Sequence, residues 1–277
     1  MLNQPTKQKK LTQYTPNIAC IHTFIHTYIH TYRVADLAIE QGIPVSIDAE
    51  KDRPHFLALL PKCDIVFTNA AFPKTHLQLH QKAAGDGGAP VDSGGSASTH
   101  DELVQRGVFE SQQERKDLLT GMCSILDGGR AKMVVTSLGA KGAVLLVRPA
   151  DLAHCEKHAK QGERENEGGS VGLARQLVDA VPLEVKEFSH TCPLTGVQLC
   201  GLYCPAMLLQ PQDIVDTTGA GDAFIGGFLS ALVNQQSHRT CLKLGTLTAT
   251  HKLRLPGARK GLPMLQNLDR YLPSREE

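Results

Sequence analysis

The sequence has no tryptophan, few other aromatic residues and no excess of charge of either sign. Aromatic side chains make up 5% of its 277 residues, and 29 basic against 28 acidic residues give a formal net charge of +1. Surfaces that bind nucleic acids usually combine a basic patch with aromatic side chains on which bases stack. Because the sequence has no such patch, we expect no nucleic-acid partner.

Long apolar runs are also missing. No run approaches the roughly 18 residues that a membrane-spanning helix needs, and the first residues lack the three-part pattern of a secretory signal peptide. We therefore expect no membrane association and a cytoplasmic location. The first 32 residues are basic and contain no acidic residue, which leaves an organellar transit peptide open.

The eight cysteines do not form a disulfide framework of the kind found in small secreted proteins. Cys200 and Cys204 come nearest to the spacing of a zinc-binding pair, which usually has a second pair close by. We expect free thiols.

The most informative segment is DTTGAGDAFIGGF, residues 216–228. Small residues lead directly into an apolar helical pattern, which indicates a helix N-terminus that an anion can approach. The first amides of a helix lack intrahelical partners and carry the positive end of the helix dipole. Asp222 would repel a phosphate there, unless it takes a proton from a hydroxyl that attacks the phosphate. The residues alone leave open a plain capped helix with a glycine-rich entry.

Two better-known glycine loops do not fit this segment. A Walker A loop ends in Gly-Lys-Ser/Thr, whereas Gly221 is followed by Asp222 and Ala223. A dinucleotide-binding fingerprint requires glycine or alanine at the position that Phe224 occupies.

Residues 216–228 resemble the second signature of the PfkB (ribokinase-like) family of carbohydrate kinases. The resemblance implies that Asp222 is the catalytic base and that Asp216 and Thr218 help to hold a monovalent cation, K⁺. It also implies that the anion hole for the transferred phosphoryl group is the backbone of Gly219, Ala220 and Gly221.

Residues 132–147 predict a strand, a glycine turn and a second strand. The family has a turn here that lies along the nucleotide, and the matching residues are Ser137, Gly139 and Gly142. An ordinary hairpin with flexible glycines is the alternative.

A predicted helix over residues 239–250 is followed by a loop over residues 255–263. These resemble the family's helix and the Gly-Ala loop that wraps the adenine and completes the cation site. Gly257 is the matching residue. A Pro-Gly turn after a helix is the alternative.

Short apolar runs separated by helical stretches predict the fold class. Strands near Val45 and Asn69 are expected to be parallel and joined by right-handed crossovers. The resemblance implies a ribokinase-like α/β fold with a mostly parallel sheet flanked by helices. The segment around these strands is similar to the ketohexokinase-like branch. Many members have a glutamate three residues after the asparagine, where this chain has Phe72, so we expect Mg²⁺ to be held mainly by nucleotide and water.

The family usually has a much longer segment before the strand at Val45. We therefore expect the chain to lack the usual N-terminal sugar-binding part and the β-lid. Residues 1–17 are polar and basic and predict a disordered tail. Residues 18–275 would form a partial kinase domain with loop insertions near residues 83–116 and 151–198, which are rich in glycine, serine and charge.

Residues 21–32 repeat a four-residue unit, Ile-His-Thr-Phe/Tyr. On a helix, His22, His26 and His30 would form one stripe that could bind a metal. Isoleucine and threonine favour a strand instead, and we interpret the segment as a low-complexity tract.

The resemblance thus implies an ATP-dependent phosphotransferase that phosphorylates a hydroxyl of a fructose- or ribose-like sugar, with Mg²⁺ and K⁺ as further cofactors. The resemblance also implies a homodimer. A kinase for a nucleoside or another alcohol is a second hypothesis. The third is a non-catalytic or truncated kinase fold that binds nucleotide or a partner.

Overall fold

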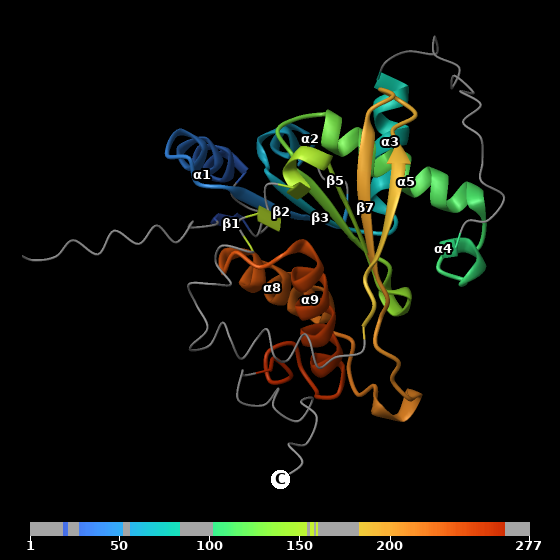
Figure 1. Ribbon diagram of the computed structural model, residues 1–277. Coiled ribbons are helices and arrows are strands. Elements are labelled where there is room, and N and C mark those ends of the chain that lie inside the picture. Colours follow the sequence, from blue (N-terminus) through green and yellow to red (C-terminus); the bar gives the residue numbers. More distant parts are fainter. Residues whose placement is uncertain are drawn as a thin grey trace, which may run out of the picture.

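The computed structural model describes residues 19–21, 28–51, 56–83, 102–153, 156–157, 159 and 183–263. In this part of the chain, one seven-stranded sheet forms the middle layer, with helices on both faces (Figure 1). The strand order is β1-β2-β3-β4-β5-β7-β6. The strands are β1 (Ala19–Ile21), β2 (Val45–Ala49), β3 (Ile65–Asn69), β4 (Met133–Ser137), β5 (Ala143–Val147), β6 (Lys186–Thr191) and β7 (Gln198–Cys204).

Strands β1 to β4 pair parallel with one another, whereas the pairs β4–β5, β5–β7 and β6–β7 are antiparallel. The predicted α/β class and the strands after residues 44 and 64 are confirmed. The sheet is mixed, with its parallel pairings between β1 and β4. The reason is that β4–β5 and β6–β7 are joined by short turns, and short turns connect antiparallel strands.

Two helical layers enclose the sheet. One face packs against α1 (Tyr28–Glu40), α3 (Phe72–Ala83) and α5 (Gln112–Asp127), and the other against α8 (Ala220–Val233) and α9 (His238–Leu253). Neighbouring residues of β3 serve opposite cores: Val66 faces the first, whereas Phe67 packs on Phe228 of α8 with ring centroids 5.3 Å apart. Strands covered on both faces are apolar throughout, and all five residues of β5 are buried.

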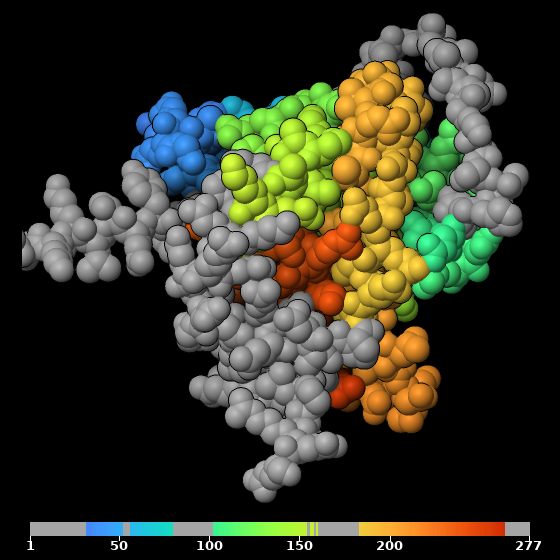
Figure 2. Space-filling view, viewed as in Figure 1, coloured from blue at the N-terminus to red at the C-terminus, as the bar shows by residue number. Residues whose placement is uncertain are grey.

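The predicted helix over residues 239–250 is confirmed as the central part of α9. The first turn of α9 is tied to the β6 end of the sheet. Arg239 donates from Nη1 to the Val185 carbonyl oxygen at 2.7 Å and forms an ion pair with Glu187. In Figure 2 the red-orange surface of the C-terminal helices borders the gold surface of β6 and β7. No helix in the described ranges is long and apolar enough to cross a membrane.

The expected loop insertions contain regular structure in part. The loop prediction is wrong for residues 102–116, where α4 (Glu102–Gln105) forms and α5 begins after the N-cap Ser111, whose side chain accepts from the Glu114 amide. Leu103 and Phe109 are buried in the core, so their apolar character outweighs the polar composition around them. The prediction is also wrong for residues 183–198, which include β6. Residues 84–101 and 160–182 lie outside the described residues.

The His-containing repeat is divided between two elements. β1 ends at Ile21 and α1 begins at Tyr28, so the strand preference is wrong for residues 28–32. Tertiary packing overrides propensity there, because α1 buries Ala35 and Ala38 against the sheet. His22, His26 and the predicted tail over residues 1–17 lie outside the described residues.

Candidate functional site

Helix α8 begins at Ala220, within the glycine-rich segment in which the sequence predicted a helix N-terminus. Its N-cap is Gly219, in the left-handed conformation with φ of 77°. A Cβ atom at this position would lie 3.0 Å from Cβ of Ala258. Glycine therefore meets two needs here, because it permits the turn into α8 and leaves room for the loop that follows α9.

Asp222 lies in the first turn of α8 and is exposed. A Cβ atom added to Gly221 would meet nothing within 4 Å, so the space beside this turn is open. The helix dipole favours negative charge at this end. The first turn of α8 can therefore receive an anion, with a carboxylate on the same turn.

Asp216 connects the segment before α8 to the loop after α9. Its Oδ1 accepts from the Thr218 amide at 2.8 Å, and its Oδ2 accepts from the Gly257 amide at 2.7 Å. Hydrogen bonds to the charged carboxylate lower the pKa of Asp216 to about 2, and those from Thr218 have a larger effect than the one from Gly257. The structure thus brings together Asp216 and Thr218 of the predicted cation site with Gly257 of the loop that was expected to complete it.

Lys252 belongs to the same place and was missed in the sequence. Its side chain is completely buried, and Nζ donates to the carbonyl oxygen of Asp216 at 2.7 Å. It also donates to the Leu255 carbonyl oxygen at 3.4 Å and lies 3.9 Å from Oδ2 of Asp216. A lysine in the last turn of a helix is usually solvated, so no sequence signal distinguishes it.

The predicted strand, glycine turn and strand is confirmed. Ser137 ends β4, opposite Asn69 at the end of β3. Gly139 opens the 3₁₀ turn η2 (Gly139–Lys141) with φ of 60°, and Gly142 has φ of 105°. A Cβ atom on Gly142 would lie 2.2 Å from the carbonyl oxygen of Cys204. This glycine is therefore required by the close passage of the chain that leaves β7.

The turn is linked to the α8 site through β7 and α9. Tyr203 donates its hydroxyl to the Lys141 carbonyl oxygen at 2.7 Å, and Sγ of Cys204 lies 3.5 Å from Oγ1 of Thr246 in α9. The predicted nucleotide residues of the turn are thus held on the helix that carries Lys252. Hydrogen bonds join Asp216 to Thr218 and to Gly257, and Gly219 lies against Ala258, the residue after Gly257. Ala220, Gly221 and Asp222 follow Gly219 in the first turn of α8.

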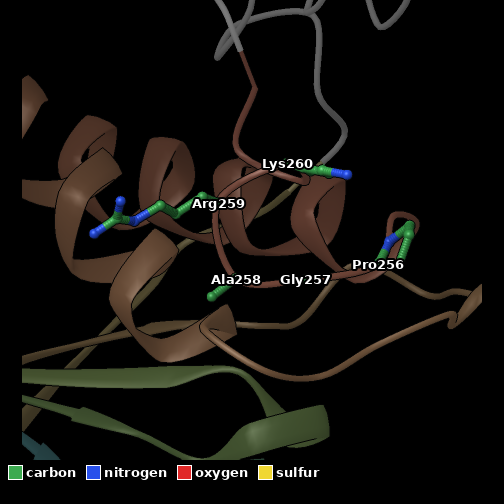
Figure 3. Close-up of a pocket in the computed structure, with 5 residues that line it drawn as sticks. All are labelled: Pro256, Gly257, Ala258, Arg259 and Lys260. Carbon is green, nitrogen blue, oxygen red and sulfur yellow. The ribbon is translucent and has the colours of Figure 1, made fainter.

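The loop after α9 lines a pocket of about 520 Å³. Figure 3 shows its five residues, with the side chains of Arg259 and Lys260 extending in opposite directions. The contacts of Gly257 with Asp216 and of Ala258 with Gly219 place this pocket beside the start of α8. Within the described residues, no group of three or more His, Cys, Asp or Glu side chains could hold a metal ion, and six cysteines are free thiols.

Residues 198–265 match the sequence model of the pfkB family carbohydrate kinases. The matched range contains β7, the start of α8, Lys252 and the pocket loop. This part of the chain is therefore similar to a segment of the pfkB family carbohydrate kinases.

The curated proteins to which this chain is similar include kinases of several kinds. The acarbose 7(IV)-phosphotransferase of an Actinoplanes species is 26% identical over 154 residues, which are 56% of this chain and 35% of that protein. Adenosine kinase 2 of Arabidopsis thaliana is 51% identical over 41 residues, which are 15% of this chain and 12% of that protein. The chain therefore spans only part of the length of these relatives.

A solved structure of ribokinase from Cryptococcus neoformans var. grubii serotype A in complex with ADP aligns with 89% of this chain and 58% of its own. The TM-score is 0.49 and the sequence identity is 17%. The ketohexokinase-like branch stays a prediction.

Proposed function

We propose that this chain carries the phosphoryl-transfer site of an ATP-dependent kinase that acts on a hydroxyl group of a sugar or a nucleoside. The observation that carries the proposal is an exposed carboxylate, Asp222, on a helix N-terminus that is open at Gly221. The site lies inside the pfkB segment. Relatives named as phosphotransferase and adenosine kinase support the reaction class.

In this proposal Asp222 accepts the proton of the attacking hydroxyl as the oxygen approaches the γ-phosphate of ATP. The amides of Gly219, Ala220 and Gly221 stabilise the charge that develops on the phosphoryl oxygens. A bound Mg²⁺ ion would neutralise part of the phosphate charge, and its ligands would come from the nucleotide and water. The acid–base step therefore needs a single side chain of this segment.

The nucleotide would lie between the turn at Ser137–Gly142 and the loop at Gly257. Both are held close to α8 by the contacts described above: the loop through Asp216 and Gly219, the turn through β7 and α9. Such fixed spacing is needed, because a phosphoryl group must meet its acceptor in a narrow range of positions. A Cβ atom on Gly139 would meet nothing within 4 Å, so the turn is open to a ligand at this residue.

The proposal is tested by ADP release from the purified chain with Mg-ATP, in turn with fructose, ribose and adenosine as acceptors. Replacing Asp222→Asn should lower turnover by about 10²–10⁴-fold, the range of general-base catalysis, and leave ADP affinity nearly unchanged. Asp213→Asn, at another exposed aspartate nine residues earlier, is the matched control and should keep full turnover. Equal turnover in both variants would refute the role of Asp222.

The same assay distinguishes the predicted acceptors. ADP release with fructose or ribose alone would support the predicted sugar acceptor, and ADP release with adenosine would support the nucleoside hypothesis. The second candidate function is a non-catalytic fold that binds nucleotide or a partner. ADP binding by calorimetry without turnover on any acceptor would support it. Sedimentation of the same sample would test the predicted homodimer.

A further inference from the structure

The ammonium group of Lys252 lies among oxygen atoms at the junction of two segments. Nζ is 2.7 Å from the Asp216 carbonyl oxygen, 3.4 Å from the Leu255 carbonyl oxygen and 3.9 Å from Oδ2 of Asp216. The amides of Val215 and Asp216 both donate to the Leu253 carbonyl oxygen, at 2.8 and 3.2 Å. The residues before α8 and those after α9 are therefore bound to each other around one buried positive charge.

A buried lysine is costly unless its charge is paired and its donors are satisfied. Here two main-chain carbonyls and one carboxylate surround a side chain with an exposed fraction of 0%. Carbonyl and carboxylate oxygens are also the groups that proteins use to replace the hydration shell of a monovalent cation. Here these oxygens surround the Lys252 ammonium group, which belongs to the chain itself, and not a bound metal ion.

This arrangement bears on the K⁺ site that the family resemblance implies at Asp216 and Thr218. The two carboxylate oxygens of Asp216 already accept from the Thr218 and Gly257 amides. The Asp216 carbonyl oxygen accepts from Lys252. A K⁺ ion among these oxygens would lie next to an ammonium group, and like charges repel more strongly in a protein than in water. The residues present do not fit a separate monovalent cation.

We infer that Lys252 takes the place of the monovalent cation, so that the site is independent of K⁺. It acts as a positioning residue, because its Nζ fixes the segment that carries Asp216 against the loop that carries Gly257. The orientation of the α8 N-terminus and of the adjacent loop then depends on a side chain instead of a dissociable ion. The part of the inference that concerns nucleotide affinity rests on the proposed function.

The test compares the full chain in KCl and in choline chloride at equal ionic strength, by thermal unfolding and by calorimetry of ADP binding. The wild-type chain should show the same unfolding midpoint and the same ADP affinity in both salts. Lys252→Ala, which removes the ammonium and leaves the oxygens, should unfold at a lower temperature and bind ADP about tenfold more weakly in choline chloride. K⁺ should restore both in a saturable manner, because an ion that binds only the folded state stabilises it.

Two variants serve as controls. Lys252→Met keeps most of the side-chain volume without the charge, so it should be destabilised and not rescued by K⁺. Lys243→Ala removes a partly exposed lysine from the same helix and should behave as the wild-type chain in both salts.

Saturable stabilisation of the wild-type chain by K⁺ would overturn the inference, since a separate cation would then bind beside Lys252. An Lys252→Ala chain as stable as wild type in choline chloride would overturn it too. If that variant does not fold, the comparison of salts in the wild-type chain still decides. If no variant binds ADP, the proposed nucleotide site fails, while thermal unfolding still tests Lys252.

Discussion

Two adjacent glycines in α8 offer a matched pair of substitutions. Gly226 is exposed, and a Cβ atom there would meet nothing within 4 Å. Gly227 is buried against α9, where a Cβ atom would lie 2.5 Å from Oγ1 of Thr248 and 2.9 Å from the Leu244 carbonyl oxygen. We predict that Gly226→Ala stabilises the fold and that Gly227→Ala does not.

The magnitude follows from two terms. Replacing glycine by alanine within a helix contributes about 1 kcal/mol at either position. At residue 227 the added methyl group must displace α9, and such overpacking costs about 1–3 kcal/mol. The propensity term is common to both variants and cancels in their difference. Gly227→Ala should therefore be less stable than Gly226→Ala by about 1–3 kcal/mol.

Urea unfolding followed by circular dichroism measures this difference directly. A third variant, Gly227→Ala with Thr248→Ala, removes the hydroxyl nearest to the new methyl group and should regain part of the loss. The hydroxyl also donates to the Leu244 carbonyl oxygen at 2.7 Å, so recovery should be incomplete. Equal stabilities for the two single variants would refute the argument that Gly227 sets the distance between α8 and α9.

Three further predictions concern other parts of the site and its support. Gly142→Ala should lower the free energy of unfolding by at least about 3 kcal/mol, because it combines a positive φ with overlap on the Cys204 carbonyl oxygen. Gly139→Ala meets no neighbour and should lower it by about 1–2 kcal/mol. Urea unfolding of both variants measures these changes. The pKa of Asp216 is lowered to about 2 by hydrogen bonds from Thr218 and Gly257. The stabilisation of the fold by the Asp216 carboxylate should therefore be complete above about pH 4 and be lost as the pH falls towards 2. Unfolding of Asp216→Asn across the same pH range should not show this loss. Burial lowers the pKa of His238 to about 4, and both of its ring nitrogens lack a partner. Because the unfolded chain binds this proton first, stability should fall as the pH decreases from about 6.5 to 4, and a pH series should show a flatter profile for His238→Leu.

Much of the site could be predicted from the sequence because it depends on local geometry. The turn into α8 requires a residue that tolerates φ of 77°, and Gly219 meets that need within a few residues of Asp222. The turn between β4 and β5 is equally local, with positive φ at Gly139 and Gly142. Positions with a positive φ can be predicted from the sequence, because they are usually occupied by glycine.

The loop insertions were predicted less well, for a physical reason. Residues 83–116 are rich in glycine, serine and charge, and the few apolar residues near the end of this range carried little weight. Leu103 and Phe109 are nevertheless buried in the core beneath α5. Whether an isolated apolar residue is buried depends on which surface the rest of the chain presents to it, and this information is not contained in the segment itself.

The sequence by itself determined the alternation of strands and helices, the anion-accessible start of α8 and the candidate base Asp222, since each depends on residues adjacent along the chain. Only the tertiary structure decided that the Asp216 carboxylate accepts from the Gly257 amide and that the buried Lys252 of α9 donates to the Asp216 carbonyl oxygen. Those contacts join residues 36 to 41 positions apart. They form because α8 and α9 pack side by side on one face of the sheet, and residue types alone do not specify such packing.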